Sequence, residues 1–211
     1  MPHHVTQRGV RSMPVFHSDI DRQDYLQLLR HHAGEDGIDF WAWCLMDNHV
    51  HLVAVPREIT SLAAGIGEAH RNYTLRYNEI DAVSGHLFQE RFHSFPVQVE
   101  GYLFSVVRYV ECNPVRAGLV KDASAYPWSS ARHHLHGTPD SLVRNSPIRD
   151  MFPDWAGVLR EHQENLDEIR KHSRTGRPYG SEAWIKSIEL LSERPLLPRK
   201  RGWKKGHHRQ Q

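Results

Sequence analysis

The chain has little cysteine and no long apolar run. Its 211 residues include two cysteines, Cys44 and Cys112, and no CxxC pair that would predict a disulfide framework or a thiolate zinc site. No apolar stretch approaches the roughly 20 residues of a membrane helix, and the N-terminal "MPHHVTQRGV" does not resemble a signal peptide. We therefore expect a folded protein with no membrane partner, located in a reducing cytoplasm.

The chain also lacks a large net charge. The formal charge is +2 at pH 7, while 39% hydrophobic and 25% charged residues predict a packed core. Basic residues are concentrated at residues 199–211, which contain no acidic residue: Arg199, Lys200, Arg201, Lys204, Lys205 and Arg209. Such a segment is typical either of a solvated tail or of contact with nucleic acid phosphates, and composition leaves both interpretations open.

Hydrophobic periodicity predicts an α+β protein. The expected order is strand, helix, strand, strand, helix, strand, helix, at residues 3–7, 18–37, 38–46, 49–56, 60–77, within 84–99 and 100–113. This order is that of a ferredoxin-like or RRM-like split βαβ unit, with an antiparallel sheet and helices on one face. The other face of the sheet would then be free to hold a site or a strand of nucleic acid.

The pattern changes after about Pro139. Helical spacing recurs within 153–169 and 181–194, separated by the loop "TGRPYG". The pair could form a DNA-binding helix-turn-helix, but the connection is longer than that motif uses, so a plain helical hairpin is favoured. The expected division is a domain at 1–135, a helical C-terminal extension at 136–198 and a basic tail at 199–211.

Two histidines stand out among the 17 of the chain. His49 and His51 flank Val50 inside the apolar run "LMDNHVHLVAVP". Side chains alternate along a strand, so both imidazoles point to the same face. They are suited to bind a metal ion together, although two surface residues on a half-exposed strand would give the same pattern.

The helix predicted at 100–113 carries a tyrosine at the edge of its apolar stripe. Leu103, Val106, Val107 and Val110 follow core spacing. Tyr109 and Asn113 lie one turn apart on the flank of that stripe and can face the same point. A tyrosine at the edge of the core, with a partner for its hydroxyl, is the simpler explanation of this position.

Several motifs together resemble the REP-associated tyrosine transposases, which belong to the single-tyrosine HUH transposases. They are "MDNHVHL", "RYVECNPVRAGLV", "YPWSS", "HHVTQRG" and "QERF", and they span roughly residues 2–132. The segment "TGRPYGSE" is similar to C-terminal extensions of some members. Asp47 stands where the family commonly has proline, and a turn tolerates either residue.

The resemblance implies a site and a reaction. Tyr109 would be the nucleophile, His49 and His51 metal ligands, and Asn113 a third ligand for Mg²⁺ or Mn²⁺. The implied activity is that of a transposase-like single-stranded DNA endonuclease and strand transferase. It forms a 5′-phosphotyrosine on palindromic hairpin DNA of the REP type. That chemistry conserves bond energy and needs no ATP, in keeping with the absence of a P-loop sequence.

Basic residues would hold the DNA backbone in such an enzyme. The expected DNA-binding residues are Arg8, Arg11, Arg71, Arg91, Arg116, Arg199, Lys200, Arg201, Lys204 and Lys205. Arg91 is favoured among them because it lies in "QERF", although a surface charge at a strand edge is an equal alternative. The protein is expected to act as a monomer or a homodimer.

Three other functions fit parts of the pattern. The chain could be a domesticated module that binds DNA or RNA hairpins without cutting them. A structural zinc site could use His49 and His51, although no cysteine ligand lies nearby. A relaxase or replication initiator would use similar chemistry, and we expect such a protein to carry a longer accessory region.

Overall fold

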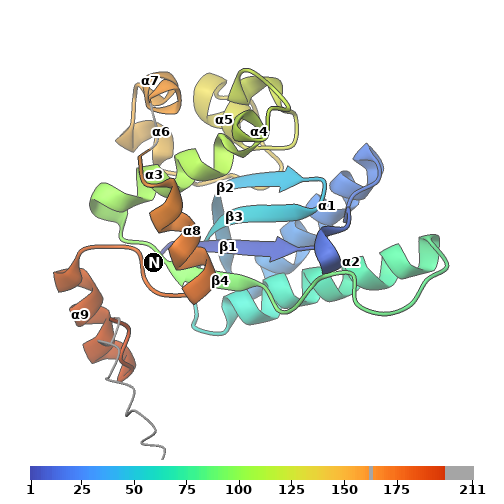
Figure 1. Ribbon diagram of the computed structural model, residues 1–211, viewed down its shortest axis with the longest axis horizontal. Coiled ribbons are helices and arrows are strands. Elements are labelled where there is room, and N and C mark those ends of the chain that lie inside the picture. The colour runs from blue at the N-terminus through green and yellow to red at the C-terminus, as the bar shows by residue number, and fades with distance from the viewer. Residues whose placement is uncertain (162–163, 198–211) are drawn as a thin grey trace, which may run out of the picture.

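The computed structural model describes residues 1–161 and 164–197, and it contains a four-stranded antiparallel sheet (Figure 1). The strands are β1 (His3–Arg8), β2 (Ile38–Met46), β3 (His49–Pro56) and β4 (His93–Pro96), in the spatial order β2-β3-β1-β4. The basic residues predicted to bind DNA at 199–205 lie outside the described residues. The α+β class and the split βαβ order are confirmed.

The hairpin of β2 and β3 places the two histidines. Asp47 and Asn48 form the turn between the strands, and His51 pairs with Thr6 of β1. Val50 and Leu52 point into the core on one face of the sheet, so His49 and His51 point to the other face. The central position of β3 therefore fixes both imidazoles on a rigid backbone.

The first face of the sheet is covered by α1 (Asp19–Asp36), the π-helical segment η2 (Leu62–Ile66) and α2 (Gly67–Ile80). Ser18 caps α1 by accepting a hydrogen bond from the backbone N–H of Asp21. Gly37 ends α1 in the left-handed conformation, with φ 67°. Buried apolar side chains of both helices and of β1 and β3 form one core cluster on this face.

The second face differs from the expectation that helices cover one face alone. Helix α3 (Val99–Glu111) packs on this side of β2 and β3. The cause lies in β2, where Ala42 and Cys44 are buried in one apolar cluster with Val106 and Val110 of α3. Strand β2 is thus apolar on both faces, and its second face also requires a cover.

Helix α3 is bounded by two backbone irregularities. Gly101 has φ 77°, so the regular part of the helix begins after it. The helix ends at Glu111, and α4 (Asn113–Arg116) continues with Pro114 in its first turn. Asn113 therefore begins α4 about one turn beyond Tyr109.

The C-terminal half contains further short helices: α5 (Ala131–His136), α6 (Ile148–Met151), α7 (Trp155–Arg160), α8 (Leu166–Thr175) and α9 (Glu182–Ser192). The segment predicted as a helical hairpin is divided among α7, α8 and α9, and α8 lies across β4 and β1 (Figure 1). Single 3-10 turns occur at Val10–Ser12 and Ala123–Ala125. Within the described part of the chain, no helix is both long and apolar enough to span a bilayer.

Candidate functional site

A cleft of about 700 Å³ opens on the second face of the sheet. Tyr109, His49, His51 and Asn113 all line it, so the structure brings the four predicted catalytic and metal-binding residues together. Strands β1 and β3, helices α3, α4 and α8 and the segment before β4 form its walls, with Thr6, Gln7, Arg8, Gln89, Glu90, His93, Arg116, Ala117, Arg170, Ser173 and Arg174 as the other lining residues.

His49 is oriented by the turn residue that precedes it. Its Nδ1 lies 2.6 Å from Oδ1 of Asn48, which accepts a hydrogen bond from that nitrogen. The Asn48 amide nitrogen in turn donates to the backbone oxygen of Ser12 at 3.2 Å. This arrangement leaves Nε2 of His49 with a lone pair, because the other ring nitrogen carries the proton.

His51 is oriented by a third histidine, His4 of β1. The Nε2 atom of His4 lies 3.0 Å from Nδ1 of His51, and the two rings are stacked. If His51 Nδ1 donates this hydrogen bond, its Nε2 is the unprotonated nitrogen that a metal requires. His4 is fully buried, and its Nδ1 has no hydrogen-bond partner among the described residues. The imidazole of His4 therefore makes its hydrogen bond through Nε2, to His51.

Burial keeps these imidazoles neutral. Desolvation, followed by the charges of Arg8 and Arg116, lowers the pKa of His49 to about 4. Desolvation also lowers the pKa of His51 well below its usual value, with smaller contributions from His49 and His4. Metal ligation needs neutral imidazole, so the pair is in the correct protonation state near pH 7.

Tyr109 lies against the rings of His51 and His4 and against a guanidinium group. Its ring centroid is 5.5 Å from that of His51, and the Arg116 guanidinium lies 4.3 Å from the Tyr109 ring centroid. Arg116 also donates to the backbone oxygen of Tyr109 at 2.6 Å. The tyrosine is therefore held at the edge of the core, as its position in the sequence predicts, and it also borders the cleft.

Asn113 faces the same point as His49. Its amide nitrogen lies 3.5 Å from His49 Nε2, so a rotated amide would present its oxygen beside that nitrogen. Two neutral imidazoles and an amide oxygen on an open cleft form a donor set that fits Mg²⁺ or Mn²⁺ with water as further ligand. The predicted ligands thus fit a divalent metal in type, protonation and placement.

A buried carboxylate anchors the helix that carries Tyr109. Glu111 accepts hydrogen bonds from Ser130 Oγ at 2.6 Å and from Trp155 Nε1 at 2.8 Å, and His134 Nδ1 lies 2.6 Å from it. Ser130 also accepts a hydrogen bond from the backbone N–H of Trp43 in β2. The network joins α3, the sheet and the C-terminal extension at one fully buried point.

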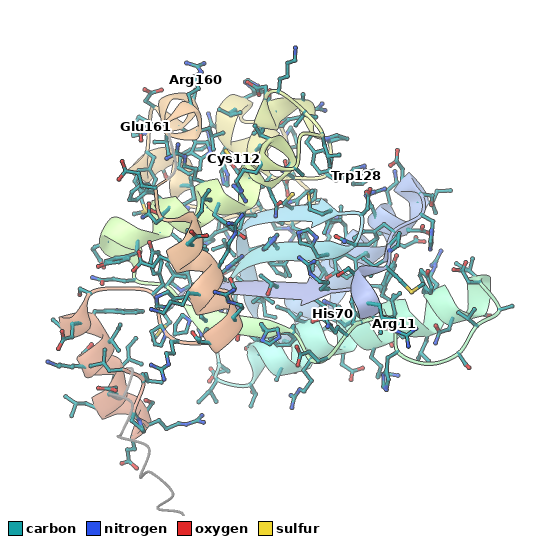
Figure 2. The ribbon with its side chains drawn as sticks, in the orientation of Figure 1. Arg11, His70, Cys112, Trp128, Arg160 and Glu161 are labelled. Atoms are coloured by element: carbon teal, nitrogen blue, oxygen red, sulfur yellow. The ribbon has the colours of Figure 1, made fainter. Side chains whose placement is uncertain are left out.

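Three predicted DNA-binding arginines do not line the cleft. Arg11 has a left-handed backbone (φ 51°) and lies beyond the end of β1, on the side away from α8 (Figure 2). Arg71 is exposed on α2 and pairs with Glu68 at 2.8 Å. Arg91 lines a neighbouring pocket of about 440 Å³, which shares Gln7, Gln89 and Glu90 with the cleft.

No role was predicted from the sequence for His4, Arg170 or Arg174. Arg170 and Arg174 of α8 line the cleft, although they lie about 60 residues beyond Tyr109. His4 belongs to the family-like "HHVTQRG" segment, which gave a signal of importance without a role. Nothing in the local pattern around Arg170 distinguishes it from other surface arginines.

Another histidine group in the described residues is unconnected with this cleft. His31, His32 and Glu35 of α1 have ligand atoms within 4.8 Å of one another. They lie on a helix that covers the opposite face of the sheet, and His31 and Glu35 are exposed. This group does not contribute to the site around Tyr109.

The antiparallel α+β sheet agrees with the fold of a transposase. The chain belongs to the IS200-like transposase family, because the model of that family matches residues 2–113, more than half of its length. Membership places it among DNA-processing enzymes with a role in transposition. The match ends at Asn113, so α8 lies outside the part that the family shares.

Two solved structures are similar to the chain. One is described as the REP-associated tyrosine transposase bound to a REP hairpin; it is 15% identical, with a TM-score of 0.51 over 69% of this chain and 86% of the other. The second, from Deinococcus radiodurans R1 and provisionally described as a transposase, is 16% identical, covers 56% of this chain and 85% of its own, and has a TM-score of 0.39. At 15% identity, the first match shows a shared fold. No curated protein matches the chain.

Proposed function

We propose that the chain cuts and rejoins single-stranded DNA through a covalent bond to Tyr109. The observation that carries this proposal is the shared cleft, in which Tyr109 borders His49, His51 and Asn113 on a rigid face of the sheet. A tyrosine beside a divalent-metal donor set and several guanidinium groups is suited to phosphoryl transfer. Attack on a phosphodiester builds negative charge, which such groups stabilise.

In the first step, the Tyr109 hydroxyl oxygen forms a bond to the phosphorus. The bond from phosphorus to the 3′-oxygen breaks, and the proton lost by the phenol balances the one gained by the new 3′-hydroxyl. The product is a 5′-phosphotyrosine, and attack by a second 3′-hydroxyl reverses the step and joins new ends. The phosphotyrosine retains the energy of the phosphodiester, so the reaction needs no nucleotide cofactor.

The IS200-like transposase family generally uses a divalent metal. His49, His51 and Asn113 would hold Mg²⁺ or Mn²⁺, which supplies Lewis-acid polarisation of the scissile phosphate when bound. The protein's own part is orientation, because Asn48 and His4 fix the two imidazole rings through their Nδ1 atoms. Arg116 stacks on the Tyr109 ring and restricts its movement.

The substrate proposed for this reaction is a palindromic DNA hairpin of the REP type with an adjoining single strand. Support comes from the motifs of the sequence and from the similar structure, which is described as bound to a REP hairpin. Arg8 and Arg116 line the cleft and are placed to contact backbone phosphates.

The test mixes full-length protein with labelled hairpin oligonucleotides taken from palindromes that flank its own gene, with Mg²⁺ or Mn²⁺. A DNA–protein adduct on a denaturing gel is expected for wild type and is expected to disappear for Tyr109→Phe. Tyr102→Phe is the matched control, because Tyr102 lies on the same helix but packs against Tyr179. Adduct formation by Tyr109→Phe would exclude this residue as the nucleophile.

A second candidate is a module that binds hairpins without cutting them. It uses the same fold and the same arginines, so binding alone does not separate it from the enzyme. Tight hairpin binding by wild type with no adduct under either metal would favour the module.

A further inference from the structure

Helix α8 delivers a row of polar side chains into the cleft. Arg170, Ser173 and Arg174 all line it, at the i, i+3 and i+4 spacing of a single helix face. The neighbouring Ile169 is fully buried in the same apolar cluster as Tyr109. One side of α8 is therefore fixed to the protein, and the adjacent side faces the nucleophile.

The position of α8 is fixed at its C-terminal end as well. Gly176 ends the helix in a left-handed conformation. The chain then returns to the sheet, where the backbone N–H of Tyr179 donates to the oxygen of Pro96 at 2.8 Å and the Tyr179 oxygen accepts from Gln98 N–H at 2.9 Å. The His172 ring packs against Phe95 and Tyr179. Helix α8 is therefore anchored to β4 and to the segment that follows it.

Arg170 of α8 interacts with Tyr109. A hydrogen bond with Asp167 first, and a hydrogen bond with Tyr109 as a smaller cause, raise the pKa of the Arg170 guanidinium. Asp167 is 96% exposed, so its pair with Arg170 at 3.1 Å is screened by water and weak. Arg170 can exchange this partner for a phosphate at little energetic cost.

The balance of charge in the cleft favours an anion with several phosphates. Its lining contains four arginines, Arg8, Arg116, Arg170 and Arg174, and a single carboxylate, Glu90. Glu90 already has a partner in His93, whose Nε2 lies at 2.7 Å. Guanidinium groups match phosphate oxygens through paired hydrogen bonds. Two of the four arginines come from α8, beyond the part matched by the family model.

We propose that α8 is a wall of the DNA-binding cleft, in which Arg170 and Arg174 hold backbone phosphates of single-stranded DNA beside Tyr109. The inference rests on the proposed function, since α8 would bind the nucleotides next to the bond that Tyr109 attacks. It gives the C-terminal extension a direct part in substrate binding.

The experiment measures binding of a fluorescein-labelled oligo-dT strand by anisotropy between roughly 50 and 200 mM salt, where phosphate contacts dominate. Each lost contact to a single strand reduces the slope of log affinity against log salt by about 0.7, so Arg170→Ala/Arg174→Ala should reduce it by about 1.4. The affinity at low salt should fall roughly tenfold. Arg170→Lys/Arg174→Lys keeps both charges and should keep most of the slope.

Lys171→Ala is the matched control, because Lys171 is an exposed cation of α8 that does not line the cleft. Thermal unfolding followed by circular dichroism checks that each variant keeps the fold of the wild type. A slope and affinity for Arg170→Ala/Arg174→Ala equal to those of Lys171→Ala would overturn the proposal.

The adduct assay with hairpin DNA tests the nuclease reaction separately from the role of α8 in DNA binding. Suppose that wild type forms the adduct and that Arg170→Ala/Arg174→Ala keeps the salt slope of wild type. This result supports the nuclease and refutes the role of α8. If the double variant has a reduced salt slope but wild type forms no adduct, α8 binds DNA in a module that does not cut it. Failure of wild type to bind the oligo-dT strand at all refutes the wall, and the adduct assay with hairpin DNA then decides the nuclease by itself.

Discussion

At the scale of single residues, the site depends on how each imidazole is turned. His49 and His51 both use Nδ1 for a hydrogen bond within the protein, to Asn48 and to His4. Such bonds select the tautomer and the ring orientation, and with Nδ1 as the donor in each, both Nε2 atoms are left for a metal. The two supporting residues thus determine whether a pair of histidines becomes a pair of ligands.

His4→Phe removes the partner of His51 and keeps an aromatic ring in a fully buried position. We expect the affinity for Mn²⁺, measured by isothermal titration calorimetry, to fall by roughly 10–100-fold, the usual cost of losing a residue that orients a metal ligand. His3→Phe is the control, because His3 alternates to the other face of β1 and hydrogen bonds to Met1. Equal Mn²⁺ affinity for His4→Phe and wild type would refute the orienting role.

At the scale of elements, α3 is held from two directions. Its apolar stripe packs on β2, and Glu111 on its other flank is bound by Ser130, His134 and Trp155. The position of Tyr109 therefore depends on residues that approach α3 from the "YPWSS" segment and from the C-terminal extension. A buried carboxylate with this many partners is costly to disturb, because each partner would be left unsatisfied.

Glu111→Ala should lower the free energy of unfolding by about 3–5 kcal/mol, because three buried partners would each lose a hydrogen bond and be left unsatisfied, at about 1–3 kcal/mol each. Urea denaturation followed by tryptophan fluorescence measures this change. Glu161→Ala is the control, since Glu161 is 68% exposed and lies 3.9 Å from Arg108 (Figure 2). A change of less than 1 kcal/mol for Glu111→Ala, about the value of an exposed pair, would show that the network does not hold the helix.

At the scale of the whole molecule, buried histidines link stability to pH. Burial lowers the pKa of His70 to about 3, and its ring hydrogen bonds to the Tyr25 hydroxyl at 2.8 Å. Below pH 6.5 the unfolded chain takes up a proton that the folded His70 resists, so the free energy of unfolding falls as the pH decreases towards 3. Above pH 6.5 His70 is unprotonated in both the folded and the unfolded chain, so it no longer makes the free energy of unfolding depend on pH.

We expect the free energy of unfolding to decrease between pH 7 and pH 5, by up to about 1.4 kcal/mol per pH unit from each such histidine. The melting temperature should decrease over the same range. His70→Gln keeps an acceptor for Tyr25 without a titrating ring and should flatten this dependence. His86→Gln, an exposed replacement, should leave it unchanged. Identical pH profiles for wild type and His70→Gln would contradict the assignment.

The C-terminal extension also belongs to the stability of the whole molecule. Trp155, Ile169 and Tyr179 are buried in the core cluster that contains α3. Each buried side chain of this size contributes about 1.5–3 kcal/mol, so their joint loss approaches the total stability of a small domain. The predicted domain at 1–135 and the extension at 136–198 therefore contribute buried side chains to the same core cluster.

A fragment of residues 1–135 should lack cooperative thermal unfolding and should lose its near-ultraviolet circular dichroism, because one face of α3 is uncovered. The full chain is the reference under the same conditions. A cooperatively unfolding fragment would support the predicted domain at 1–135.

The sequence by itself determined the order of the elements and the identity of four residues that line the cleft, His49, His51, Tyr109 and Asn113. Alternation placed His49 and His51 on one face, the turn at Asp47–Asn48 fixed the hairpin, and helical spacing put Asn113 one turn beyond Tyr109. These are local relations, and local periodicity carries them. The tertiary structure alone decided that α3 covers the second face, that His4 meets His51 through the β1–β3 register, and that α8 brings Arg170 to Tyr109. Those contacts join residues that lie far apart in the chain, and they arise because buried apolar surface on β2 and Ile169 had to be covered, which no local pattern records.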